Sequence, residues 1–173
     1  MEKEERLKLV AAIEKCFFKG MKRGWASGAK AKPDFPFNGA KGYVYYPLAT
    51  RKFDQHLDSL VLFDYFFVHP ESRASYGTTI ILYRGSSVWI MNYGGCYDKE
   101  AIPIVKKSLM AAYNNNCFLG GRGVDMVDGD LEYENNILPH DDSFGRFDSE
   151  ETVRNIKTGE ELGGHLFHGG LLI

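Results

Sequence analysis

Two short segments of the sequence place a ring side chain directly before a pair of glycines. They are residues 92–95 (Asn-Tyr-Gly-Gly) and 167–170 (Phe-His-Gly-Gly). The Tyr93 phenol and the His168 imidazole can each donate or accept a hydrogen bond, and glycine lets a ligand or a second backbone come close. Each segment also ends a stretch that predicts a β-hairpin, so we expect both rings to border a shared hollow.

The two hairpins are candidates for an internal duplication. Residues 77–83 align with residues 149–155 at an offset of 72 (149 − 77), and the ring-and-glycine segments align at an offset of 75 (170 − 95). A longer turn in the second copy absorbs the difference. A true duplication would make Tyr93 and His168 equivalent; chance matching in a glycine- and tyrosine-rich chain is the alternative.

Cys96 is the candidate nucleophile. It follows two glycines and precedes an expected helix, whose N-terminus could lower the pKa of the thiol. His168 could act as its base if the hairpins lie side by side. Acid–base chemistry by Asp64, Glu151 and His168 is an equal alternative. An inert buried cysteine explains Cys96 as well, so the sequence assigns no catalytic residue and leaves enzymatic activity open.

Histidine spacing does not favour a metal site. His165 and His168 are three residues apart, which in a strand directs them to opposite faces of the sheet. Residues 140–142 (His-Asp-Asp) could recruit a cation, but such clusters are more often solvated turns. We therefore expect neither a metal nor another cofactor.

Aromatic rings with a few polar groups among them favour a small-molecule site instead. Arg122 lies among glycines and is a planar anion donor, and Asn92 could orient a ligand. Trp89 lies in an apolar run and is expected in the core. The candidate ligand-binding residues are Trp25, Asp64, Asn92, Tyr93, Arg122, Tyr133, Glu151 and His168.

Two amphipathic helices are expected to position these residues. Apolar residues recur every three or four positions within residues 1–24 and again within residues 98–116. In the first helix the apolar stripe runs from Leu7 to Met21. In the second, Pro103 has to fall in the first turn, where its missing N–H has no helical partner to lose.

Strands are expected in two blocks that the second helix separates, residues 42–97 and residues 117–173. Residues 25–41, rich in glycine, lysine and proline, are expected to form a loop or lid. The whole chain is predicted to be one α+β domain, a curved and mainly antiparallel sheet of about six to eight strands with two helices packed on one face. The expected strands cover residues 42–48, 58–68, 130–137, 151–156 and 162–168 and the hairpin 76–95, with a polar tip at 92–95 and a loop at 139–142.

The composition of the chain disfavours several classes of function. With 173 residues and 14% aromatic residues the chain can bury a core, and its net charge of −2 disfavours direct binding to nucleic acid. No apolar run is long enough to cross a bilayer, and the N-terminus does not resemble a signal peptide. Three cysteines without CxxC spacing fit reduced thiols. We expect a cytoplasmic protein, although export by a specialised secretion system needs no signal peptide.

Several of these motifs together resemble an uncharacterised bacterial domain of unknown function. The matching residues, within about residues 12–170, are Trp25-Ala26, Asp64, 88–95, Arg122-Gly123, Tyr133, Glu151 and 168–170. Members of that family often occur alone or follow a helix-turn-helix regulator domain of the XRE type, and the resemblance implies no known reaction. The family's glycine-x-glutamate before each hairpin is incomplete here, because Thr79 replaces the glutamate in the first copy and Ser149 the glycine in the second.

The sequence therefore predicts a small-molecule-binding or sensory domain. An enzyme of the hydrolase or transferase type, using Cys96 or His168 with a carboxylate, is the first alternative. A protein-interaction module is the second. The identity of the ligand, the partner proteins and the oligomeric state cannot be read from the chain.

Overall fold

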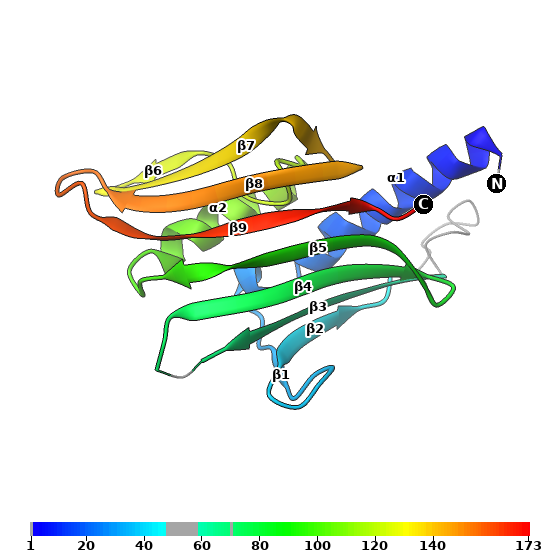
Figure 1. The fold of residues 1–173 in the computed structure, drawn as a ribbon, viewed down its shortest axis with the longest axis horizontal. Coiled ribbons are helices and arrows are strands. Elements are labelled where there is room, and N and C mark those ends of the chain that lie inside the picture. Colours follow the sequence, from blue (N-terminus) through cyan, green and yellow to red (C-terminus); the bar gives the residue numbers. More distant parts are fainter. Residues whose placement is uncertain (1, 48–58, 70) are drawn as a thin grey trace.

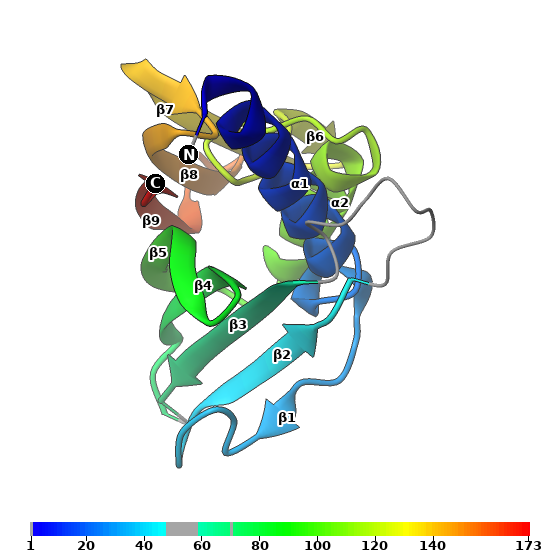
Figure 2. The same cartoon turned by 90° about the vertical axis from the view of Figure 1, so that its right-hand side faces the viewer.

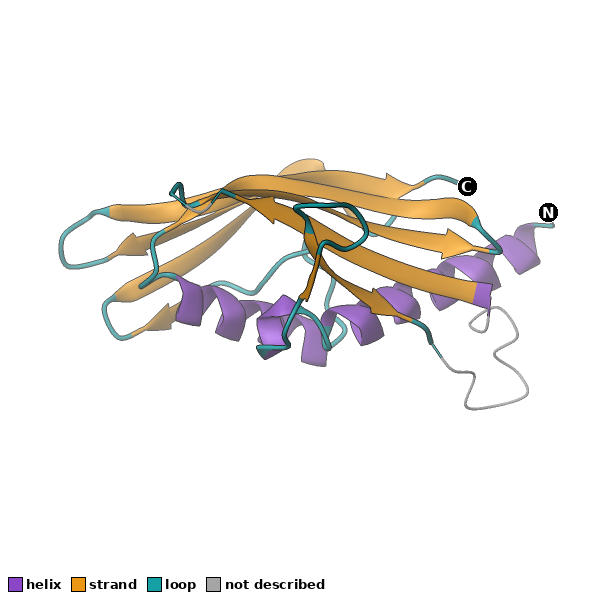
Figure 3. Cartoon of the chain, turned by 90° about the horizontal axis from the view of Figure 1, so that it is seen from below, coloured by secondary structure: helices purple, strands orange, loops and turns teal. Residues whose placement is uncertain are grey.

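The computed structural model describes residues 2–47, 59–69 and 71–173 and has an α+β fold. One open antiparallel sheet has the strand order β1-β2-β3-β4-β5-β9-β8-β7-β6 (Figure 1). Figure 3 shows both helices on the same side of the curved sheet. We call the face that carries the helices the inner face and the opposite one the outer face.

The sheet has nine strands, where the sequence predicts about six to eight. Two of the strands, β1 and β6, have only two and three residues and are too short to show alternation. The elements are α1 (Lys3–Met21), η1 (Trp25–Ser27), β1 (Lys32–Pro33), β2 (Lys41–Tyr45), β3 (Leu60–Val68), β4 (Ala74–Tyr83), β5 (Ser86–Tyr97), α2 (Ile102–Asn114), β6 (Met126–Asp128), β7 (Leu131–Ser143), β8 (Arg146–Asn155) and β9 (Glu161–Leu171).

The two helices bury one face each against the sheet, next to one another (Figure 2). Ile13 and Phe17 of α1 are fully buried, whereas Leu7 is 62% exposed. Leu7, the first residue of the predicted stripe, is therefore not part of the core, because the N-terminal end of α1 projects beyond the sheet (Figure 1). Pro103 lies in the first turn of α2, as predicted, because α2 begins at Ile102.

Trp89 of β5 is at the centre of the core, as predicted, and is fully buried. Its ring stacks on Phe144 and Phe147, with centroids 5.1 and 5.7 Å away. Its Nε1 donates a hydrogen bond of 3.0 Å to the carbonyl oxygen of Phe144. The ring is thus fixed by packing and by one hydrogen bond, which leaves it no part in a binding site.

The last strand of each half of the chain lies in the middle of the sheet, where β5 pairs with β9. Tyr93 is directly opposite Phe167, and Asn92 is directly opposite His168. Residues opposite one another share a face of the sheet, and successive residues alternate, so Tyr93 and His168 point to opposite faces. The prediction that these two rings border a shared hollow is therefore wrong. For the same reason, the alignment offset of 75 residues is not a structural equivalence.

Three further segments differ from the prediction. Residues 92–95 are not a tip, because β5 continues to Tyr97. Residues 25–41 are not one loop, because they contain η1 and β1, and β1 pairs with β2. Residues 139–142 are not a loop but part of β7. The structure does not describe the side chains of residues 139–142. Leu48 and Asp58, at the ends of two predicted strands, lie outside the described residues altogether.

Candidate functional site

A cavity of about 200 Å³ lies between the inner face of the sheet and the segments η1 and α2. Most of its wall is apolar, and Asp64, Arg73, Arg122 and His165 are its ionisable groups other than tyrosines. The cavity is lined by Met21, Trp25, Ala26, Asp64, Phe66, Val68, Arg73, Ser75, Tyr93, Tyr97, Ile102, Leu109, Tyr113, Arg122 and His165. A concave, partly open and mostly apolar space with a few polar groups is the usual make-up of a small-molecule site.

Tyr93 reaches Asp64 across a glycine. Gly77 of β4 lies directly opposite Tyr93, and a Cβ atom at residue 77 would lie 2.6 Å from both the Tyr93 hydroxyl and the Tyr65 carbonyl oxygen. The ring can therefore lie across β4, where Tyr93 Oη donates a hydrogen bond of 2.9 Å to Asp64 Oδ1. Thr79 Oγ1 donates a second bond of 2.9 Å to the same oxygen.

Asp64 is a carboxyl group that is almost entirely removed from water, with 5% of its surface exposed. Burial raises its pKa above the ordinary value, and the hydrogen bonds from Thr79 and Tyr93 and the charge of Arg122 offset this only in part. Such a group accepts hydrogen bonds when ionised and can donate one when protonated.

Glu151 is the centre of a second buried cluster. Arg122 Nη2 and Tyr97 Oη donate hydrogen bonds to its Oε1, and Tyr133 Oη donates to its Oε2. Burial alone would raise the pKa of Glu151, but the charge of Arg122 and these three hydrogen bonds lower it below the ordinary value. Glu151 is therefore ionised at neutral pH, and it neutralises the charge of Arg122.

Glycines direct Arg122 into the protein interior. Gly120 and Gly121 have φ angles of 58° and 87°, which glycine adopts without strain. The Arg122 guanidinium lies over the ring of Phe167, 5.0 Å from its centroid. The Nε atom of Arg122 is buried and has no hydrogen-bond partner in the described part of the chain. The arginine therefore keeps one buried hydrogen-bond donor unused, in a residue that lines the cavity.

His165 of β9 is the site residue that the sequence prediction omits. Its ring lies 4.5 Å from the ring of Tyr97, and its Nε2 is 3.2 Å from Ser75 Oγ. Burial, aided by the charge of Arg122, lowers its pKa to about 4, so the imidazole is neutral at pH 7. Its Nδ1 is buried and, among the described residues, lacks a partner.

The structure brings together six of the eight candidate residues. Four of them line the cavity: Trp25, Asp64, Tyr93 and Arg122. The Nζ atom of Lys106 lies over the ring of Trp25, 4.8 Å from the ring centroid. The other two, Tyr133 and Glu151, are buried behind Arg122 and hold it in place.

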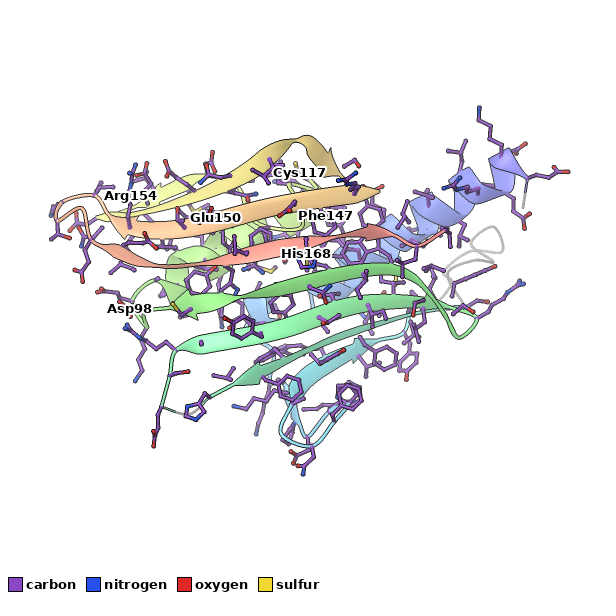
Figure 4. All side chains as sticks on the ribbon, in the orientation of Figure 1. Asp98, Cys117, Phe147, Glu150, Arg154 and His168 are labelled. Carbon is purple, nitrogen blue, oxygen red and sulfur yellow. The ribbon has the colours of Figure 1, made fainter. Side chains whose placement is uncertain are left out.

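Asn92 and His168 lie on the outer face, away from the cavity. Asn92 Nδ2 is 3.5 Å from His168 Nε2, at the limit of a hydrogen bond, and both side chains are open to solvent. Figure 4 looks onto this face, with His168 labelled on β9. Cys96 is also exposed. It lies opposite Gly164, four residues along the strand from the position opposite His168, which is roughly 13 Å. Cys96 and His168 therefore do not form a catalytic pair.

The comparison with protein families agrees with the resemblance noted in the sequence. Residues 69–172, more than half of the chain, match the model of a family described as a domain of unknown function, DUF5680. The chain belongs to this family. The matched range contains Tyr93, Arg122, Glu151 and His165, whereas Trp25 and Asp64 lie before it. No curated protein and no solved structure matched the chain. Within the described residues, no helix has the length and apolar character needed to cross a membrane.

Proposed function

We propose that this protein binds a small organic molecule in the cavity between the inner face of the sheet and the segments η1 and α2. One observation carries the proposal. Of the three buried side-chain atoms without a hydrogen-bond partner in the described chain, two belong to residues that line this cavity, Arg122 Nε and His165 Nδ1. An unpaired buried polar group costs about 1–3 kcal/mol, so a ligand that pairs with both atoms recovers that free energy.

The surroundings of the two atoms support the same proposal. Trp25, Phe66 and Tyr113 offer ring surfaces for an apolar ligand body. The volume of about 200 Å³ is below the range for drug-sized ligands and suits a metabolite of about one or two rings. The sensory form of the proposal rests on the resemblance to domains that often follow a helix-turn-helix regulator domain.

The alternatives have less support. An enzyme built on Cys96 or His168 would have to work on the outer face, away from the cavity. A protein-interaction role would use an exposed row on that same face, where Phe67, Tyr76 and Leu166 occupy neighbouring positions of paired strands. That row lacks the unpaired buried polar atoms that distinguish the cavity.

The test uses two substitutions that add the same ring to opposite faces of β4. Ser75 lines the cavity, whereas Thr78, three residues on, points to the outer face and bonds to Asn92. The wild-type protein, purified under native conditions, is examined for bound molecules by native mass spectrometry and screened against a metabolite panel by thermal shift. We expect a ligand that Ser75→Phe excludes and Thr78→Phe retains. A ligand lost equally from both variants, or repeated empty preparations with no thermal shift, would contradict the proposal.

A further inference from the structure

The two arginines that line the cavity are both paired with carboxylates. Arg122 is paired with Glu151, which also accepts hydrogen bonds from Tyr97 and Tyr133. The other lining arginine, Arg73, forms an ion pair with Asp98. His165 is neutral at pH 7, because its pKa is lowered to about 4 by burial and by Arg122. The hydrogen-bonding capacity of Arg122 is thus available to a ligand, while its charge is already balanced.

Asp64 adds a reason against an anionic ligand. It lines the same cavity, is buried, and has no ion-pair partner among the described residues. A ligand carboxylate would leave water for a site that offers no unbalanced cation and includes a second carboxyl group. A cationic ligand would need Asp64 to be ionised, and the burial that raises the pKa of Asp64 opposes this.

The two residues that carry the unpaired atoms both line the cavity and lie near one another. His165 and Phe167 are two residues apart on β9 and share the inner face, so their Cα atoms are roughly 7 Å apart. Arg122 lies over the Phe167 ring, and its charge contributes to the lowered pKa of His165, so the guanidinium lies near the imidazole. Arg122 Nε can only donate, whereas His165 Nδ1 donates or accepts according to its tautomer.

From these features we infer that the cavity selects an uncharged aromatic or heteroaromatic compound that carries a carbonyl-type acceptor, such as an amide or lactam. The acceptor takes the hydrogen bond of Arg122 Nε, and an adjacent N–H or O–H group bonds to His165 or Asp64. The ring occupies the apolar part of the wall, beside Trp25 and Tyr113. This inference rests on the proposed function, because it specifies the ligand of the same cavity.

The test compares four single-ring probes of nearly the same shape: benzamide, toluene, benzoate and benzylamine. Isothermal titration calorimetry or ligand-observed NMR gives their affinities for the wild-type protein at pH 7. We expect benzamide to bind at least about tenfold more tightly than each of the others. Benzoate or benzylamine binding as tightly as benzamide would overturn the assignment of an uncharged ligand. Toluene binding as tightly as benzamide would overturn the role of the polar atoms and leave the binding cavity standing.

Two conservative variants sharpen the comparison. Arg122→Lys keeps a positive charge opposite Glu151 but removes the Nε donor, so benzamide should lose about tenfold in affinity and toluene should lose none. Arg154→Lys alters an exposed arginine of β8 and should change no affinity. If Arg122→Lys fails to fold, the four wild-type affinities still decide. If none of the four probes binds but the metabolite panel yields a ligand, an uncharged ligand supports the inference and a charged one overturns it. If the panel is empty as well, the proposed function itself fails.

Discussion

The inner and outer faces of strands β4, β5, β8 and β9 carry similar residues in very different surroundings. Each face has a glutamate, a histidine and a tyrosine packed over a glycine: Glu151, His165 and Tyr93 inside, and Glu150, His168 and Tyr76 outside. On the inner face the pKa values of Glu151 and His165 are lowered, and two polar atoms lack partners. The type of residue therefore determines which chemistry is available, and the face on which the residue lies determines whether the protein can use that chemistry.

The largest difference is expected between the two neighbouring glutamates. Glu151→Gln removes the carboxylate that pairs with buried Arg122, and should lower the free energy of unfolding by about 3–5 kcal/mol. Glu150→Gln, on the exposed face, should change it by less than about 0.5 kcal/mol. Urea denaturation of both variants measures the two values. Similar losses in the two variants would contradict the account of Glu151.

The buried imidazole of His165 should make the stability of the protein depend on pH. The folded-state pKa of His165 is lowered from 6.5 to about 4, so folding keeps the imidazole neutral while the unfolded chain takes up a proton. Its stabilising contribution is complete above pH 6.5 and is lost as the pH falls towards about 4. Between pH 7 and pH 5, His165→Gln should therefore lose less stability than the wild type, by on the order of 2 kcal/mol. Urea titrations of the wild type and of His165→Gln at both pH values measure this difference, and equal losses in the two proteins would contradict the burial of a neutral imidazole.

The two glycines opposite tyrosines should respond unequally to an added methyl group. In Gly77→Ala the Cβ atom would meet the partly buried ring of Tyr93 and the backbone oxygen of Tyr65, and this oxygen cannot move aside. In Gly94→Ala the three atoms nearest to the Cβ atom would all belong to the ring of Tyr76, which is 64% exposed and can turn outwards. We expect losses of about 1–3 kcal/mol and of less than about 1 kcal/mol, respectively. Thermal denaturation ranks the two, and the reverse order would contradict the packing described for Tyr93.

The smallest effect is expected from removing one hydroxyl group. Tyr93→Phe deletes the hydrogen bond to Asp64 and should lower stability by about 1 kcal/mol. Because that bond holds the pKa of Asp64 down, the variant should also raise the pKa of Asp64 further, which carbon-detected NMR of the carboxyl group can follow. Tyr76→Phe on the outer face should leave both quantities unchanged. An unaltered Asp64 titration in Tyr93→Phe would show that the hydroxyl does not influence the carboxyl group.

Much of the fold could be predicted from local patterns. Helical periodicity located α1 and α2 to within a few residues, and Pro103 marked the first turn of α2. The order of the strands and the number of short ones could not be predicted, because both depend on pairing between distant segments. The pairing of Tyr93 with Phe167 rather than with His168 is such a case, since a shift of one residue reverses the face of every side chain.

The candidate site could be predicted only in part, because local patterns do not show which distant segments pack together. Glycines around Arg122 and beside Tyr93 indicated close packing at both residues, and both line the cavity. His165 directly follows Gly163 and Gly164, a local signal of the same kind that the sequence prediction did not use, and it shares a face of β9 with Phe167 and not with His168. Ser75 and Tyr113 join the wall only through tertiary packing, which no spacing in the sequence encodes.

The most direct test of the binding cavity is an NMR titration that observes His165 and His168 in one sample. Their ring signals are assigned with the His165→Gln and His168→Gln variants, and benzamide is added at pH 7. The account predicts that the His165 signals move with saturation while those of His168 stay in place, because only His165 lines the cavity. Saturable shifts at His168 with His165 unchanged would contradict it.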